Sequence, residues 1–332
     1  MRIACGGEGA PACGGAAMGW NGIMFVTGEA RVAVPATSAN LGPGFDSLGL
    51  ALAIEDEVTA RITTEGVHVE VTGEGAGEVP TGDDHLIVQT MWRTFAALGV
   101  ERPPGIALTC HNRIPHARGL GSSSAAIVAG ILLAREFAGA GPEDAAVLRL
   151  AAEIEGHPDN VAPCVLGGFT IAWTEGDPAA GARAVRLEPA PGIAPTVLIP
   201  SDRGLTTAAR AALPQHVPHR DAAFNAARSA LLVHALTADP SLLFEATEDR
   251  LHQQYRAPGM PETAELLHKL RLAGVPACVS GAGPSVLALA PVDRVSIPPG
   301  WYARSVAWSA SGARILSARH AEGDPVAAGP SS

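Results

Sequence analysis

A glycine- and serine-rich segment, Pro115-His-Ala-Arg-Gly-Leu-Gly-Ser-Ser-Ser-Ala125, carries the strongest chemical signal in the sequence. Small residues let a backbone curl closely around an anion, and the apolar run at 126–134 that follows predicts a helix. The free N–H groups at the start of that helix would point at the anion. The three serines stand at the same end and could bind phosphate oxygens or a cation. A serine-capped helix after a glycine turn would explain the glycines alone, but the whole segment predicts a phosphate-binding loop.

Two further segments combine turn formers with polar side chains. The first, Val34-Pro-Ala-Thr-Ser-Ala-Asn-Leu-Gly-Pro-Gly-Phe-Asp-Ser-Leu-Gly49, follows a short predicted strand. Its Asn40 and Asp46 side chains could orient a small polar substrate, which a mere connection between elements would not need. The second, Val279-Ser-Gly-Ala-Gly-Pro-Ser-Val-Leu-Ala-Leu289, is a glycine loop before an apolar strand. Taken alone, this last segment would be interpreted as a hairpin or a turn.

Together and in this order, the three segments resemble the motifs of the galactokinase, homoserine kinase, mevalonate kinase and phosphomevalonate kinase (GHMP) superfamily. The resemblance covers nearly all of residues 29–318. Within the superfamily, residues 35–46, His157-Pro-Asp-Asn-Val-Ala-Pro163 and His252-Gln-Gln-Tyr-Arg-Ala-Pro258 are similar to the homoserine kinase family. The implied reaction is ATP-dependent phosphorylation of the L-homoserine side-chain hydroxyl to O-phospho-L-homoserine, in threonine biosynthesis. Two alternatives stay open: a kinase of the same superfamily acting on another small alcohol, and a small-molecule-binding relative that has lost catalysis.

The resemblance implies ATP and Mg²⁺ as the cosubstrate and cofactor. It assigns ATP binding to the residues of the phosphate loop: Pro115, His116, Ala117, Arg118, Gly119, Leu120, Gly121, Ser122, Ser123, Ser124 and Ala125. Ser122 and Glu153 match the metal ligands, with Ser123 and Glu155 as alternatives. These oxygen ligands suit Mg²⁺, a hard cation that bridges phosphates. His85 stands where relatives often carry an asparagine near the adenine.

The homoserine pocket is implied at six positions: Asn40, Asp46, His157, Asn160, Arg210 and Arg256. An arginine fork suits a carboxylate bidentately, so the two arginines would hold the substrate carboxylate and Asp46 its ammonium group. Asn160 and Asp46 are the catalytic candidates. The resemblance places Asn160, not Asp159, against the substrate, so we expect alignment and charge neutralisation rather than a strong base. Asp159 as a general base is the alternative.

Composition excludes several other classes of protein. The chain has 332 residues, 47% of them hydrophobic and 17% charged, which predicts a sizeable core and roughly two domains. Its formal charge of −10 disfavours nucleic-acid and membrane-surface binding. Lys269 is the sole lysine and lies in a helix-like stretch without a glycine loop. Walker-A and protein-kinase folds, which use a lysine at the phosphates, are therefore disfavoured.

The cysteines and the apolar runs indicate a reducing, cytoplasmic location. The five cysteines are widely spaced and form no C-x-x-C pair, which argues against disulfides and structural zinc. The longest apolar stretch, 125–134, is far shorter than the roughly 20 residues of a membrane span. The N-terminus has no signal-peptide pattern. The resemblance is the only ground for expecting a homodimer.

Strand and helix signals alternate irregularly, which favours an α+β fold. Strand-like runs are predicted at residues 30–34, 58–63, 67–71, 106–110, 169–173, 196–199, 277–279 and 285–290. Helix-like runs are predicted at residues 84–98, 123–137, 142–155, 220–236, 240–253 and 261–273. The domain prediction is a flexible leader at 1–28, an ATP-binding domain at 29–180, a C-terminal domain at 181–318 and a flexible tail at 319–332. The resemblance implies a first domain like ribosomal protein S5 domain 2 and a ferredoxin-like second domain.

Overall fold

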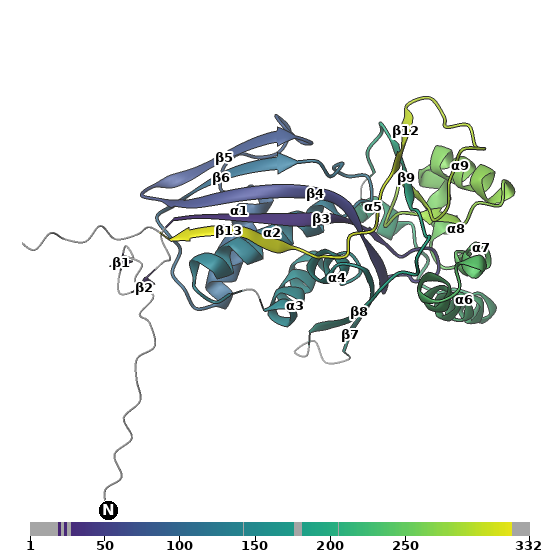
Figure 1. Ribbon diagram of the computed structural model, residues 1–332, viewed down its shortest axis with the longest axis horizontal. Helices are drawn as coiled ribbons and strands as arrows, with labels where there is room; N and C mark the ends of the chain where they lie inside the picture. The colour runs from purple at the N-terminus through teal and green to yellow at the C-terminus, as the bar shows by residue number, and fades with distance from the viewer. Residues whose placement is uncertain are drawn as a thin grey trace, which may run out of the picture.

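The larger of two main sheets forms one layer of the molecule (Figure 1). The computed structural model describes residues 19–20, 23–24, 28–141, 143–175, 181–204 and 206–320. Within them, the central order is β13-β3-β4-β6-β5, while β7 pairs with β4 and β8 with β7. Only β5 and β6 run parallel among these pairs. The strands are β3 (Gly28–Ala39), β4 (Leu48–Thr63), β5 (Gly66–Gly73), β6 (Gly105–Asn112), β7 (Phe169–Thr174), β8 (Ala182–Leu187) and β13 (Arg314–His320).

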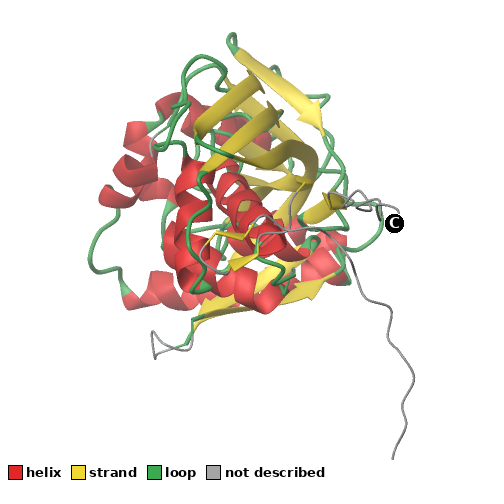
Figure 2. Cartoon of the chain, turned by 90° about the vertical axis from the view of Figure 1, so that its left-hand side faces the viewer, coloured by secondary structure: helices red, strands yellow, loops and turns green. Residues whose placement is uncertain are grey.

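Helices cover one face of this sheet, as Figure 2 shows from the side. They are α1 (Leu86–Ala97), α2 (Ser122–Phe137), α3 (Asp144–Glu155) and α4 (Val161–Leu166). Helix α2 is apolar nearly all round because it packs against α1, α3 and strand β3 at once. Its burial fixes the position of its N-terminal end, where the phosphate loop enters. The short strands β1 (Gly19–Trp20) and β2 (Ile23–Met24) pair with each other.

The smaller sheet is antiparallel, and all of its strands come from the second half of the chain. It consists of β9 (Thr196–Pro200), β10 (Ala277–Val279), β11 (Val286–Ala288) and β12 (Trp301–Ser305), in the order β10-β11-β9-β12. Leu198, Leu266 and Leu270 fill its core with Val286. The helical elements between β9 and β10 are α5 (Thr206–Ala211), α6 (His219–Thr237), η2 (Pro240–Leu242), α7 (Leu243–Ala246), α8 (Gln253–Arg256), η3 (Ala257–Gly259) and α9 (Pro261–Leu272).

The α+β prediction is confirmed, but one predicted helix is wrong. Residues 240–253 do not form a continuous helix; they break into η2, α7 and the turn that precedes α8. The Asp249 carboxylate accepts hydrogen bonds from the backbone N–H groups of Leu251, His252 and Gln253. A short acidic side chain that takes backbone donors in this way ends one helix and begins another.

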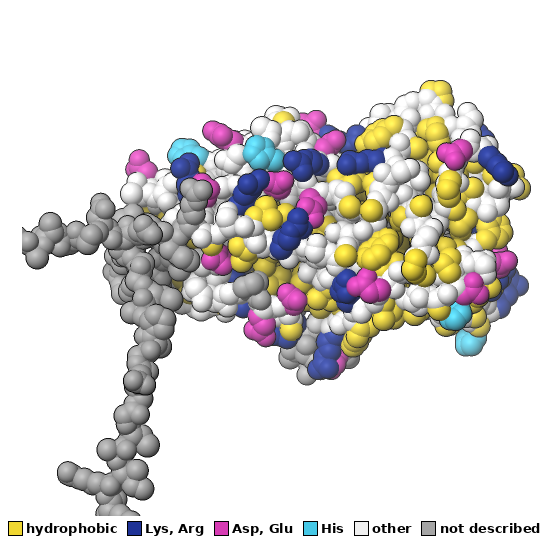
Figure 3. Space-filling view, viewed as in Figure 1, with side chains coloured by type: hydrophobic (Ala, Val, Ile, Leu, Met, Phe, Trp, Pro, Cys, Tyr) yellow, Lys and Arg dark blue, Asp and Glu magenta, His cyan; other side chains and the backbone are white. Residues whose placement is uncertain are grey.

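The predicted domain boundaries stay predictions. Strands β8 and β13 lie in the larger sheet, although both follow residue 180 in the chain. The predicted leader and tail fall almost wholly outside the described residues. No helix in the described ranges is both long and apolar enough to cross a bilayer. On the face seen in Figure 3, basic and acidic side chains are interspersed, so this face presents no uniformly basic area.

Candidate active site

The phosphate loop joins β6 to α2 and depends on two glycines. Gly119 and Gly121 have φ angles of +73° and +71°, which side-chain-bearing residues rarely adopt. A Cβ atom on Gly121 would lie 2.0 Å from Thr37 Oγ1, and one on Gly119 would lie 2.2 Å from Ser280 O. Gly121 is the N-cap of α2, so the first free N–H groups of the helix open from this point. Backbone N–H groups at this point could therefore bind an anion.

The three motif segments of the sequence meet at this loop. The Thr37 N–H group donates to Leu120 O at 3.0 Å, which ties the β3 segment to the phosphate loop. The Ser280 hydroxyl lies 2.7 Å from Gly119 O and 2.8 Å from Ser38 Oγ. The Ser280 segment thus binds both of the other two segments, and the phosphate loop is held between them.

Arg118, predicted as an ATP-binding residue, is engaged by the smaller sheet. Its guanidinium donates to Pro200 O at 2.8 Å, to Ser201 O at 2.7 Å and to His116 O at 2.8 Å. These carbonyls lie at the end of β9 and within the loop itself. Arg118 therefore fastens the phosphate loop to the second half of the chain. Burial, the largest contribution, lowers the pKa of the neighbouring His116 side chain below its ordinary value.

The structure brings Glu155, the alternative metal ligand, to the loop serines. Glu155 Oε2 lies 3.0 Å from Ser123 Oγ, and Glu155 Oε1 lies 3.0 Å from Ser124 Oγ. Glu153 is exposed and lines a groove of about 740 Å³ that also contains Arg149. Two positions along a helix differ in direction by about 200°, so only one of the two glutamates can face the loop.

Oxygen atoms alone make up this Glu155 and serine set, which fits Mg²⁺ as a hard cation. In the described part of the chain, no cluster of three His, Cys, Asp or Glu side chains could hold a metal ion. A metal at Glu155 would therefore need most of its ligands from phosphate and water, which is the usual arrangement for Mg²⁺ bound with a nucleotide.

Asp46 and Arg210 form a bidentate ion pair at the substrate end of the site. Arg210 Nη1 lies 3.0 Å from Asp46 Oδ2, and Nη2 lies 2.9 Å from Oδ1. These hydrogen bonds raise the pKa of Arg210. Asn40 Oδ1 accepts from the Asp46 backbone N–H at 2.9 Å, while its amide nitrogen donates to Gly281 O at 2.8 Å. Asn40 therefore sets the position of Asp46 and joins its loop to the Ser280 segment.

Arg256 is buried without a carboxylate partner. Only 4% of its surface is exposed, and no salt bridge joins it to any described residue. Its guanidinium donates to Ala209 O at 3.1 Å and, more weakly, to Gly281 O at 3.3 Å. Burial first, and then the charge of Arg210, lower the pKa of Arg256. The charges of Asp46, Asp249 and Asp159 act on Arg256 from beyond ion-pair distance, so a bound carboxylate could still pair with its guanidinium directly.

His157, Asp159 and Asn160 lie in the connection between α3 and α4. His157 Nδ1 is 2.6 Å from Asp159 Oδ1, and Asp159 is 2% exposed. Burial alone would lower the pKa of His157, but the hydrogen bond and the charge of Asp159 raise it above its ordinary value overall. Asn160 Oδ1 lies 2.9 Å from Thr37 Oγ1, beside the phosphate loop. This connection thus links the substrate end of the site to the phosphate end.

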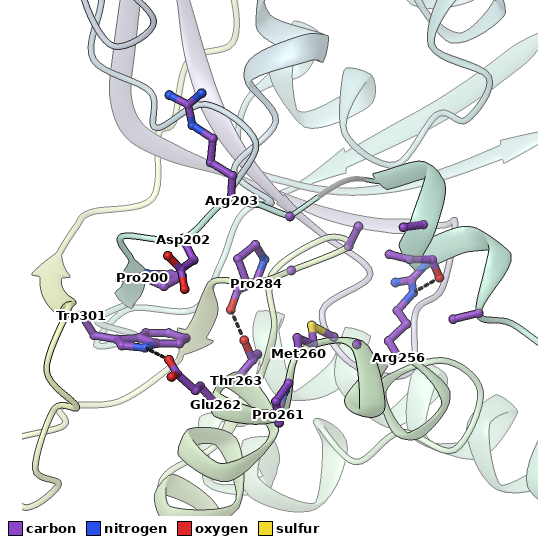
Figure 4. Close-up of a pocket in the computed structure, with 17 residues that line it drawn as sticks. Pro200, Asp202, Arg203, Arg256, Met260, Pro261, Glu262, Thr263, Pro284 and Trp301 are labelled. Atoms are coloured by element: carbon purple, nitrogen blue, oxygen red, sulfur yellow. Dashed lines mark hydrogen bonds between the residues drawn. The ribbon is translucent and has the colours of Figure 1, made fainter.

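Figure 4 shows a cavity of about 510 Å³ that borders the same site. Arg256 lies at one end of it and Trp301 at the other, with Met260 between them. Thr263 Oγ1 donates to Pro284 O at 2.8 Å, which secures the Ser280 segment from the cavity side. The sequence patterns do not predict this cavity, because its walls come from segments far apart in the chain.

Two residues near the arginines received no role from the sequence. The Phe45 ring packs on the His252 ring at a centroid distance of 5.3 Å. The guanidinium carbons of Arg210 and Arg256 lie 5.7 Å and 5.4 Å from the centroid of the Phe45 ring. Both Phe45 and His252 stand inside the motif segments quoted above. An aromatic or histidine side chain inside such a segment is the signal that could have found them.

The comparisons with known proteins agree on one family. Residues 85–168 match the GHMP kinases N terminal domain model, and residues 228–296 match the GHMP kinases C terminal model. A homoserine kinase of Streptomyces avermitilis is 52% identical over 89% of this chain and 98% of its own length. One from Clavibacter michiganensis is 56% identical over 78% of this chain and 82% of its own length.

Solved structures show the same relationship. The crystal structure of homoserine kinase from Cytophaga hutchinsonii has a TM-score of 0.73 and 26% identity, and the match covers 87% of this chain and 97% of that one. The structure of L. major mevalonate kinase in complex with R-mevalonate has a TM-score of 0.62 and 13% identity, covering 85% and 97%, so it shares the fold. The chain belongs to the homoserine kinase family of GHMP kinases.

Proposed function

We propose that this member of the homoserine kinase family transfers the γ-phosphoryl group of ATP to the side-chain hydroxyl of L-homoserine. The choice of substrate is supported by a buried Arg256 that has no ion-pair partner among the described residues and that stands near the Asp46–Arg210 ion pair. An α-amino acid presents one carboxylate and one ammonium group. The carboxylate would be held between the two arginines. The ammonium group would replace Arg210 as the ion-pair partner of Asp46.

The phosphate end of the site supplies backbone donors and oxygen ligands. The N–H groups at the start of α2 would hold the triphosphate, as at other helix N-termini that bind phosphate. Glu155 and Ser123 would hold Mg²⁺, with Ser124 as the second hydroxyl beside the same carboxylate. When bound, Mg²⁺ neutralises charge that develops on the phosphate oxygens. The proposal therefore takes Glu155 in place of Glu153 and Ser123 in place of Ser122.

Alignment rather than a general base would drive the transfer. Asp159 is buried and its carboxylate lies 2.6 Å from His157 Nδ1, which supports a role in orienting the imidazole over a role as the general base. Asn160 accepts a hydrogen bond from Thr37 beside the phosphate loop, and it would contact the reacting hydroxyl. Positioning and charge neutralisation account for most of the catalysis in a loose phosphoryl-transfer transition state. Cytoplasmic location and homodimerisation stay predictions.

A substrate panel tests this function. ADP release would be followed with L-homoserine, with 3-aminopropan-1-ol, which lacks the carboxylate, and with 4-hydroxybutanoate, which lacks the ammonium group. We expect rapid turnover of L-homoserine alone, with O-phospho-L-homoserine identified by ³¹P NMR. Equal turnover of all three alcohols would contradict the assignment of the charged pocket, and ATP binding without any turnover would indicate a binding protein.

A further inference from the structure

His252 joins the loop at residues 40–47, which we call the substrate loop, to Arg256. It is completely buried, with 0% of its surface exposed. Its Nε2 atom lies 2.8 Å from Gly42 O, and its Nδ1 atom lies 3.1 Å from Arg256 Nη1. A carbonyl oxygen only accepts and a guanidinium only donates. The two contacts are therefore satisfied together by the neutral tautomer that carries its proton on Nε2.

The backbone on both sides of His252 is anchored. The Asp249 side chain is fully buried and accepts from the His252 N–H at 3.1 Å and from the Gln253 N–H at 2.8 Å. Asn225 donates from one amide nitrogen to both Asp249 and Pro43 O, at 3.1 Å and 3.0 Å. The ring of Phe45 packs against the imidazole. The imidazole is thus fixed before any substrate arrives.

The contact between His252 Nδ1 and the guanidinium orients Arg256 without adding a negative charge beside it. Among the described residues, His252 is the one side chain that accepts a hydrogen bond from Arg256; the other two acceptors are backbone carbonyls. A carboxylate at the same place would fix the guanidinium but would also compensate its charge. A neutral imidazole fixes the direction of the guanidinium and leaves it able to form an ion pair with a bound anion.

We propose that neutral His252 is the positioning residue for Arg256. By bonding to both Gly42 O and the guanidinium, His252 would hold the Arg256 side chain in the direction that lets it bind the substrate carboxylate. This inference rests on the proposed function, because it takes the carboxylate of L-homoserine as the anion. It adds to that function a residue that acts through Arg256 and does not touch the substrate itself.

Protonation of His252 would break this arrangement. A proton on Nδ1 would face the N–H group of Arg256, so two donors would oppose each other. The charged groups around the ring are Asp249 before α8, Arg256 within α8 and Asp46 in the substrate loop. Burial, the largest contribution, lowers the pKa of His252, against the raising effect of Asp249. We therefore expect the ring to be neutral at pH 7 and its protonation on acidification to weaken the binding of L-homoserine.

Two amide substitutions separate the contacts of His252. His252→Gln places an amide nitrogen at the level of Nε2, which keeps the Gly42 contact and removes the acceptor for Arg256. His252→Asn places an amide oxygen at the level of Nδ1 and keeps that acceptor. We expect His252→Gln to raise Kd and KM for L-homoserine about 10-fold. His252→Asn should raise them less, and KM for ATP should change little in either variant.

The matched control is Ser229→Ala, which removes a hydrogen bond of 2.7 Å to Pro43 O in the same loop without touching Arg256. It should leave Kd for L-homoserine nearly unchanged. In an Arg256→Ala background, His252→Gln should cause no further loss of affinity. Both His252 variants should also show a smaller acid-dependent rise in Kd than the parent chain, in which His252 and His157 both titrate. Equal losses from Gln, Asn and the serine control, or a full loss in the Arg256→Ala background, would overturn the proposal.

Calorimetric titration keeps this test separate from the test of the proposed function. L-homoserine binding that follows the expected order of variants, without turnover, would contradict the kinase assignment and support the role of His252. Turnover of L-homoserine with no difference between the Gln and Asn variants would support the kinase assignment and contradict the role of His252. Failure of the parent chain to bind L-homoserine at all would contradict both.

Discussion

The phosphate half and the substrate half of the site are built in different ways. Backbone atoms make the phosphate half: Gly119 and Gly121 in left-handed conformations, and the N-terminus of a buried helix. Charged side chains make the substrate half, where Asp46, Arg210 and Arg256 converge from distant segments. On the proposed function, an anion would be held by dipoles in one half and by charged side chains in the other.

The difference teaches what each half tolerates. A backbone site has no spare volume, so an added atom should abolish binding altogether. A side-chain site is a sum of separate contacts, so losing one should cost a limited amount and affect one substrate only. Substitutions in the two halves should therefore differ in the size of their effect and in which substrate they affect.

The largest expected effect comes from adding one methyl group to the phosphate loop. In Gly121→Ala the new Cβ would lie 2.0 Å from Thr37 Oγ1, at a residue with φ of +71°. We expect turnover to fall at least about 100-fold, because overpacking and left-handed strain together cost roughly 3 kcal/mol or more. Gly139→Ala is the matched control, since Gly139 has φ of +66° and no atom within 4 Å of its Cβ position. Steady-state kinetics would decide; similar losses in both variants would show that strain, and not the site, is responsible.

The next effect separates the two glutamates of α3. Glu155→Gln removes the charge beside Ser123 and Ser124, so we expect kcat to fall at least about 10-fold and the Mg²⁺ requirement to rise. The Kd for L-homoserine should be unchanged, because the substrate half is intact. Glu153→Gln, on the exposed side of the helix, serves as the control and should behave as the parent chain does. A Mg²⁺ titration in which Glu153→Gln is the defective variant would return the role to Glu153.

A third effect lies beneath the phosphate loop and should leave activity at neutral pH unchanged, because it concerns stability. Asp56 accepts from the N–H groups of Arg113 at 2.6 Å and Ile114 at 2.9 Å, and burial raises its pKa from 3.8 to about 6. Between these values the folded state binds more protons than the unfolded state, so the free energy of unfolding falls as pH rises. Relative to Asp56→Asn, the parent chain should lose up to about 3 kcal/mol between pH 4 and pH 7.

Urea unfolding of both chains across this pH range measures the difference. Asn keeps an oxygen that can accept from the two N–H groups but cannot titrate in this range, so it isolates the contribution of the carboxyl group. Identical pH profiles for the two chains would mean that Asp56 does not titrate in the folded protein near pH 6.

The sequence predicts the phosphate half far better than the substrate half. Residues 115–125 are consecutive, so their glycines and the apolar helix behind them indicate the loop directly. The choice between Glu153 and Glu155 depends on the rotation of α3, which the spacing alone does not settle. Asp46 and Arg210 are 164 positions apart, and only the family resemblance brought them together. No local pattern predicts that Asp249 would interrupt a helix and hold His252 against Arg256.

The most direct measurement compares L-homoserine with 3-aminopropan-1-ol in the parent chain and in Arg256→Leu. Loss of a charge-assisted hydrogen bond typically costs about 1.5–3 kcal/mol, or roughly 10- to 150-fold in affinity. We predict that KM for L-homoserine rises by that range while KM for ATP stays nearly constant. The carboxylate-free analogue should be a poor substrate for the parent chain and lose little more in the variant. Equal losses on both alcohols would contradict the account, because Arg256 would then support the fold and not the carboxylate.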